Sequence, residues 1–137
     1  MINTNIFNIE LGNGGIFSTI KYCGLILKEE VAASYSKIDC LMIQLSDYHS
    51  LSLVIPSKVF MYASTPYPII YSAEGFTKRF LEKISGSIYF DKNNPSSFFD
   101  SILKSRSTQI NIENRDSFLD LYNSDVIYSN YASHILK

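Results

Sequence analysis

The amino-acid sequence predicts an α/β fold with a parallel sheet of about five strands and helices on both faces. Short runs of strand-forming residues alternate along the chain with segments of about ten residues that have helical periodicity. Such alternation is typical of βαβ units, whose right-handed crossovers place helices on both sides of a parallel sheet. The 137 residues, 46% of them hydrophobic, suffice for a single domain over 1–137 with its own core.

Five apolar runs are expected to be strands. Most of them are rich in Ile, Tyr, Phe or Thr and lie next to Gly, Asn or Pro. The third run is nearly all apolar, as expected of a strand that is covered on both faces. The predicted strands are 6–11, 19–23, 40–45, 68–72 and 87–90.

Helical patterns fill the intervals between these strands. Asn94 and Pro95 are a favourable helix start, because Asn is a preferred N-cap and Pro is tolerated in the first turn. The helix that they open is expected to turn Phe98, Phe99, Ile102 and Leu103 inward. The other predicted helices are 28–38, 57–64, 75–85 and one or two closing helices over about 113–137.

Composition excludes several classes of protein. A net charge of −1 and a pI of about 6.1 argue against a nucleic-acid binder that is held by a positive field. No segment reaches the roughly 18 apolar residues that a membrane helix needs. Cys23 and Cys40 are too few for a disulfide scaffold, and their spacing fits no zinc or redox motif. We therefore expect reduced cysteines and no metal or cofactor.

Open parallel sheets bind ligands at the carboxyl ends of their strands. Four segments are expected at that edge, namely 12–15, 24–27, 46–58 and 72–75. The Gly-Asn-Gly-Gly run at 12–15 precedes a predicted strand and not a helix, so we interpret it as a turn. The segment 46–58 is long for a loop and ends in Pro56-Ser57-Lys58, directly before a helix. A helix start exposes unpaired N–H groups that suit a phosphate. The alternative is an ordinary helix start, with Ser57 as the cap and Lys58 in solvent.

Other polar residues give weaker signals. His49 and His134 each lack a second ligand at metal spacing, so we interpret both as surface residues. The acidic residues that flank the predicted strands are interpreted as solvated or capping groups; they are Asp39, Asp47, Glu74 and Asp91. No nucleophile and base can be paired from spacing alone.

The span from about Thr19 to Phe90 resembles the C-terminal, nucleotide-sugar-binding domain of group 1 (family 4) glycosyltransferases. The sequence PSKVFMYA at 56–63 is similar to the helix start of many polysaccharide-assembly members. TIKYCG at 19–24 precedes it in the family order, and PIIYS at 68–72, GSIYF at 86–90 and Asn94-Pro95 follow. The resemblance implies a Rossmann-like domain that is half of a GT-B fold, from the assembly of a bacterial surface polysaccharide such as capsule or lipopolysaccharide.

The resemblance also implies a reaction and a site. The reaction moves a sugar from a UDP- or GDP-linked donor to a polysaccharide or glycolipid acceptor, with retention of configuration and without a metal. Pro56, Ser57 and Lys58 would lie against the donor phosphates and sugar, and the turn at Gly24 and Leu25 against the base. The family glutamate that holds the ribose is replaced here by Met61.

The length of the chain leaves several hypotheses open. Compared with the family domain, a strand and a helix ahead of residue 6 and the whole acceptor-binding half are missing. We expect a fragment or truncated gene product of a transferase that does not turn over alone, or one subunit of a two-chain enzyme with an N-terminal partner chain. A homo-oligomer is a further option. The chain is otherwise a non-catalytic interaction module with a degenerate site; a flavodoxin- or receiver-like domain is a more distant alternative. We expect a cytoplasmic protein with at most peripheral contact at the inner face of the membrane, and no nucleic-acid partner.

Overall fold

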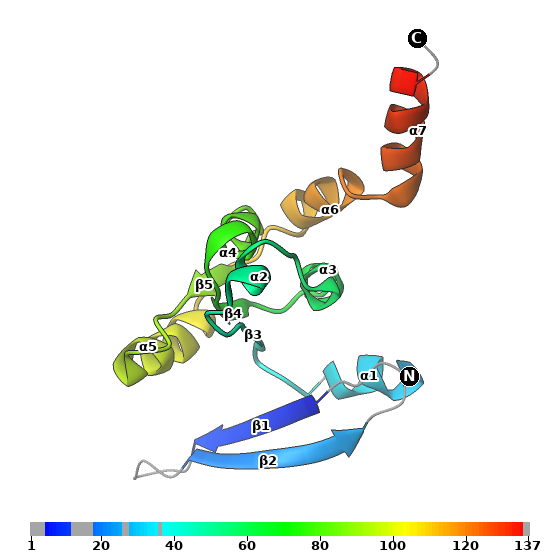
Figure 1. Cartoon of the computed structure of the whole chain (residues 1–137). Coiled ribbons are helices and arrows are strands. Elements are labelled where there is room, and N and C mark those ends of the chain that lie inside the picture. The colour runs from blue at the N-terminus through cyan, green and yellow to red at the C-terminus, as the bar shows by residue number, and fades with distance from the viewer. Residues whose placement is uncertain (1–4, 12–17, 26–27, 36, 136–137) are drawn as a thin grey trace. The chain divides into compact units, whose positions relative to one another are not determined.

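The computed structural model describes residues 5–11, 18–25, 28–35 and 37–135. Side chains are described from Glu30 to Ser129, apart from those at 32 and 36. The chain divides into two compact units, Met1–Ile38 and Asp39–Lys137, each of which is described by itself (Figure 1).

The first unit contains an antiparallel pair of strands and a helix. Strand β1 (Asn5–Leu11) pairs with β2 (Ser18–Leu25), with an irregularity between Asn5 and Phe7, and α1 (Lys28–Tyr35) follows. The prediction of two strands here is confirmed, but their expected place in a parallel sheet is wrong. Only residues 12–17 join them, whereas a parallel crossover needs a dozen residues or more.

The second unit is built on a parallel sheet of three strands, not of about five. Strand β3 (Leu41–Gln44) pairs with β4 (Ile69–Ser72), and β4 pairs with β5 (Ser87–Tyr89), so the order is β3-β4-β5. The register aligns Met42 with Ile70 and Ile70 with Ile88. The central strand β4 is buried along its whole length, which agrees with the large side chains of Ile69, Ile70 and Tyr71.

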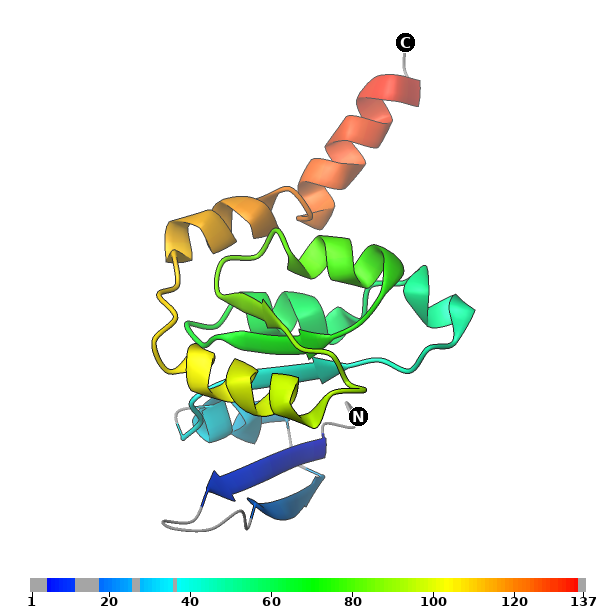
Figure 2. The same cartoon turned by 90° about the vertical axis from the view of Figure 1, so that its left-hand side faces the viewer.

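Six helices accompany this sheet in the described chain. The connection from β3 to β4 holds α2 (His49–Ser52) and α3 (Ser57–Ala63), and α4 (Gly75–Leu81) joins β4 to β5. After β5 come α5 (Pro95–Ser105), α6 (Ile112–Asp120) and α7 (Ser124–Ile135), the last two within the predicted closing range. Figures 1 and 2 show α5 on one side of the sheet and α3 and α4 on the other.

Side chains along each strand point alternately to the two faces of the sheet, and each face packs against helices. On one face, Ile70, Ile88 and Phe90 pack against Phe98 and Ile102 of α5. Phe99 and Leu103, which were expected to point inward, are 37% and 59% exposed. The prediction was wrong for these two residues because the face of α5 that meets the sheet is completed by the small, buried Ser101 and Ser105.

An aromatic cluster holds the helices on the other side of the sheet together. Phe80 of α4 lies edge-on to Phe60 of α3 and to Phe118 of α6, with ring centroids 5.4 and 5.0 Å apart. Tyr122, just after α6, lies 4.9 Å from the Phe80 ring. Edge-to-face pairs of this kind add about 0.5–1.5 kcal/mol each to the burial of the rings.

A buried arginine fixes α6 to two turns at the amino ends of the strands. Arg115 is 1% exposed, and its Nε and Nη1 donate to the backbone oxygens of Ser85 and Thr65. Burial lowers the pKa of the guanidinium. Gly86, next to Ser85, has a φ of +77°, and a Cβ there would lie 3.1 Å from Nη2 of Arg115. The positive φ favours glycine in this turn, and a Cβ there would also crowd the arginine.

Candidate functional site

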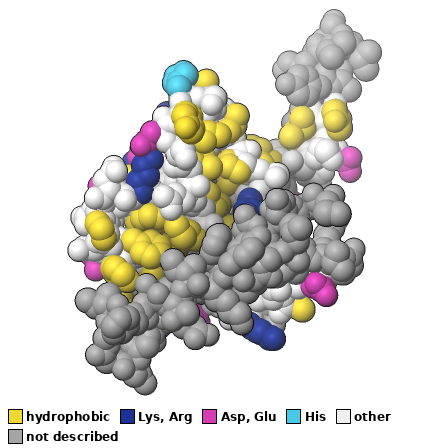
Figure 3. Space-filling view, turned by 60° about the horizontal axis from the view of Figure 1, so that its bottom comes forward, with side chains coloured by type: hydrophobic (Ala, Val, Ile, Leu, Met, Phe, Trp, Pro, Cys, Tyr) yellow, Lys and Arg dark blue, Asp and Glu magenta, His cyan; other side chains and the backbone are white. Residues whose placement is uncertain are grey.

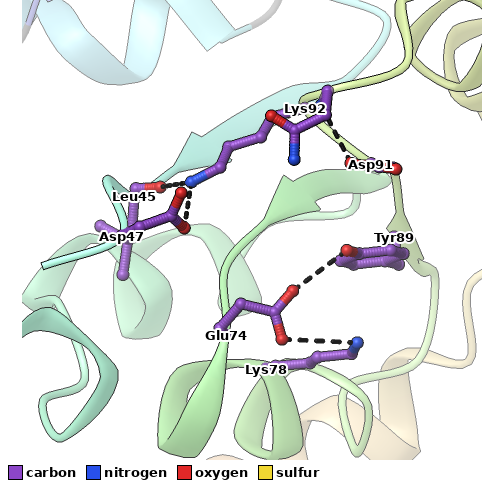
Figure 4. Close-up of polar contacts among 8 residues, drawn as sticks. Leu45, Asp47, Glu74, Lys78, Tyr89, Asp91 and Lys92 are labelled. Carbon is purple, nitrogen blue, oxygen red and sulfur yellow. Dashed lines mark hydrogen bonds and ion pairs between the residues drawn. The ribbon is translucent and has the colours of Figure 1, made fainter. Parts of the chain in front are cut away.

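The carboxyl end of the three-stranded sheet gathers charged side chains from all three strands. Asp47 follows β3, Glu74 follows β4, and Asp91 and Lys92 follow β5 (Figure 4). Open α/β sheets bind ligands at this edge, so these segments, together with the start of α3, are the candidate site.

Glu74 is the centre of one group of contacts. Its Oε1 accepts a hydrogen bond of 3.1 Å from the Tyr89 hydroxyl, and its Oε2 lies 3.7 Å from Nζ of Lys78. The Lys78 ammonium also lies 4.2 Å from the centroid of the Tyr89 ring. Burial and the bond to Glu74 raise the pKa of Tyr89, so its hydroxyl acts here as a donor. Both carboxylate oxygens of Glu74 therefore already have a partner, in Tyr89 and Lys78.

Lys92 forms the second group of contacts. Its ammonium makes an ion pair with the Asp47 carboxylate and lies 3.5 Å from the backbone oxygen of Leu45. Asp91 bonds the backbone of its own turn, as a capping group does, whereas Asp47 and Glu74 pair with lysines, which the sequence did not predict.

The long segment after β3 is anchored to α4. The segment 46–58, predicted to be one loop, contains the short helix α2 (His49–Ser52). Gly75 has a φ of +63°, and a Cβ on it would lie 2.5 Å from the Ser52 oxygen. The fully buried Thr77 donates its hydroxyl to the backbone oxygen of Val54. These contacts fix the path of the chain into α3.

The start of α3 brings four of the predicted site residues together. Pro56 is the N-cap residue and makes no side-chain capping bond, so the expectation of Ser57 as the cap is wrong. Ser57 is exposed at the first helical position, Lys58 is partly buried beside it, and Met61 lies one turn further on. Among the described side chains, Lys58 has no carboxylate within ion-pairing distance. The helix thus begins with free side-chain donors and no capping side chain.

The remaining predicted site residues belong to other elements of the chain. Gly24 and Leu25 end β2 in the first unit, where side chains are not described, and the 12–15 turn lies outside the described residues. His49 is exposed at the start of α2, as expected, while the His134 side chain is outside the described set. Cys40 is a free, partly buried thiol whose pKa is raised by burial.

A shallow hollow of about 590 Å³ lies at the opposite, amino end of the strands. Its wall combines apolar residues with an acid, a base and hydroxyls: Asp39, Pro66, Pro68, Ser105, Arg106, Thr108, Ile110 and Ile112. Arg106 follows the carboxyl end of α5, where the helix dipole disfavours an anion. We therefore place the candidate site at the carboxyl edge, where the charged side chains gather.

Comparison with known families, characterised proteins and solved structures finds no match to this chain. Within the described residues, no group of three or more His, Cys, Asp or Glu side chains could hold a metal ion. No helix of the described part is both long and apolar enough to cross a membrane.

Proposed function

We propose that this chain is the donor-binding, Rossmann-like half of a GT-B glycosyltransferase, with a UDP- or GDP-linked sugar as its ligand. The observation that carries the proposal is the start of α3. It lies beyond the carboxyl end of β3, has no side-chain cap, and presents Ser57 and Lys58 at its first two positions. Helix starts of this kind bind phosphate through backbone N–H groups and the positive end of the dipole.

Each residue of this site has a separate role in the proposal. The amides at the start of α3 and the Ser57 hydroxyl donate to oxygens of the diphosphate, and the Lys58 ammonium supplies charge. Pro56 keeps the chain extended where it enters the helix, with φ −60° and ψ 138°. Met61 offers no carboxylate to the ribose hydroxyls. Binding is therefore weak, in the millimolar range, about −4 kcal/mol.

The acceptor half of the enzyme is supplied by another chain, or by a part of the same protein beyond this sequence. The chain alone binds donor and does not transfer sugar in this proposal. The acceptor is a polysaccharide or a glycolipid, which places the assembled enzyme in the cytoplasm at the inner face of the membrane.

Calorimetry with UDP- and GDP-linked sugars tests the proposal. We expect weak heats for one nucleotide class, and a loss of about tenfold in affinity for Lys58→Met, the size typical of one charge-assisted contact. The matched control is Lys83→Met, which removes an exposed lysine beyond the end of α4. No heat at millimolar ligand from a folded protein, or equal losses for the two variants, would contradict the proposal.

An exposed apolar surface favours the interaction module as the second candidate function. Around α2 and the start of α4, Tyr48, Leu53, Val54 and Phe76 are 72%, 66%, 46% and 48% exposed. Figure 3 shows how hydrophobic side chains gather on one face of the molecule. Exposed apolar clusters of this kind mark protein-binding surfaces.

Sedimentation velocity over a concentration series tests this second candidate. A self-associating module gives a sedimentation coefficient that rises with concentration, and Leu53→Asp abolishes the rise. A coefficient that stays constant, with measurable donor binding, would favour the transferase domain over self-association.

A further inference from the structure

Lys92 stands on a turn that the sequence builds tightly. The Asp91 carboxylate accepts a hydrogen bond of 2.9 Å from the Asn93 amide, and the Asp91 amide donates to the Ser97 hydroxyl at 2.9 Å. Asn94 caps α5 by accepting from the Ser96 amide at 3.1 Å. Asx turns and helix caps of this kind hold the backbone in one conformation. The base of the Lys92 side chain is therefore fixed.

From this fixed base the Lys92 side chain reaches across the sheet. Lys92 follows β5, whereas its partners Asp47 and Leu45 follow β3, and β4 lies between the two strands. The side chain thus crosses the carboxyl end of β4, where Ala73 is 3% exposed (Figure 4). The Lys92 side chain is 19% exposed and that of Asp47 is 71% exposed. The lysine is largely removed from water, while its carboxylate partner is not.

We propose that Lys92 and Asp47 form an electrostatic latch across the carboxyl end of the sheet, and that a diphosphate displaces Asp47 from the Lys92 ammonium. The inference rests on the proposed function for the identity of the anion. An ion pair with a largely exposed carboxylate contributes little, so a ligand of higher charge competes with it. Because Lys92 is already largely desolvated, the exchange of partners buries no further positive charge.

The second lysine of this edge does not take part in the latch. Lys78 and its partner Glu74 are four residues apart, at the start of the same helix, so their ion pair links no separate strands. In the described chain, Lys92 joins the segment after β5 to the segment after β3 through its contacts with Asp47 and with the Leu45 oxygen. Displacement of Asp47 removes one of the contacts that hold the chain between Leu45 and α2.

The test is a titration with inorganic pyrophosphate, followed by amide chemical shifts, on four proteins. Asp47→Asn removes the competing charge and is expected to raise the affinity about fivefold over the wild type, the size of a typical exposed ion pair. The double variant Asp47→Asn/Lys92→Met is expected to lose that gain. Asp100→Asn, which removes an exposed carboxylate on α5, is the charge-matched control and is expected to bind as the wild type does.

The outcomes separate the latch from the proposed function. If Asp47→Asn binds no more tightly than Asp100→Asn, or if its gain survives the loss of Lys92, the latch is refuted. If nucleotide binding depends on Lys58 but Asp47→Asn has no effect, the latch is refuted and the proposed function stands. If Asp47→Asn raises the affinity for pyrophosphate only when Lys92 is present, and the chain binds no nucleotide, the latch is supported as an anion contact and the donor site is refuted.

Discussion

Replacing Gly75 by alanine is expected to destabilise the second unit through a collision with the backbone of α2. The φ of +63° costs an alanine about 1–2 kcal/mol. The added Cβ would lie 2.5 Å from the Ser52 oxygen and 2.7 Å from the Ser52 Cβ. Because the first of these atoms belongs to the backbone, no side-chain rotation relieves the contact, and overpacking adds about 1–3 kcal/mol. We expect a total loss of about 2–5 kcal/mol in the free energy of unfolding.

Gly86→Ala is the matched control for this prediction. Its φ of +77° carries a similar conformational cost, but its added Cβ would meet the side chain of Ile110, with Cγ1 at 2.8 Å. A side-chain end moves more easily than a helix backbone, so Gly86→Ala should cost less than Gly75→Ala. Urea unfolding followed by circular dichroism measures both, since the chain has no tryptophan. A loss below about 1 kcal/mol for Gly75→Ala, or a loss no larger than that of Gly86→Ala, would refute the reasoning.

Three further predictions concern the core and the caps. Burial raises the pKa of Tyr71 to about 12 from 10.0, so the native state keeps its proton longer than the unfolded chain. The contribution of Tyr71 to the free energy of unfolding should be complete below pH 10 and should fall by about 2–3 kcal/mol as the pH rises from 10 to 12. Tyr71→Phe should remove that part of the fall. Arg115→Ala leaves two backbone oxygens without their donor and should cost about 2–4 kcal/mol in urea unfolding; a loss below about 1 kcal/mol would contradict the assigned contacts. Asn94→Ala should cost about 1 kcal/mol through the lost cap, measured against the equivalent Asn111→Ala on α6; no loss for either would show that these caps do not stabilise their helices.

The parts of the fold that depend on local pattern were predictable from the sequence. The three strands of the parallel sheet and the helix capped by Asn94 lie where periodicity and capping residues place them. The pairing of the first two strands was not anticipated, although the short connection at 12–17 favours an antiparallel pair. Strand propensity does not indicate which strand pairs with which. The length of the connection between two strands does, because a short connection allows only an antiparallel pair.

The candidate site was predictable only in part. The start of α3 is a local signal, since Pro, Ser and Lys precede an apolar helical pattern. The contact of Lys92 with Asp47 joins residues 45 positions apart, and no sequence pattern links them. Helix α2 has four residues and no buried side chain, so it lacks the periodicity that a longer amphipathic helix shows. Contacts between distant segments depend on the order of strands in the sheet, which cannot be derived from local sequence patterns.

The most direct test of the donor site is an amide chemical-shift titration of the wild-type chain with UDP and GDP, and with UDP-linked sugars. The proposed function predicts that the largest shifts fall at Ser57, Lys58 and Met61, that they saturate at millimolar ligand, and that Lys58→Met reduces them while Lys83→Met does not. Shifts that cluster at the amino end of the strands, around Asp39 and Arg106, or no saturable shifts at all, would contradict a donor site at the start of α3.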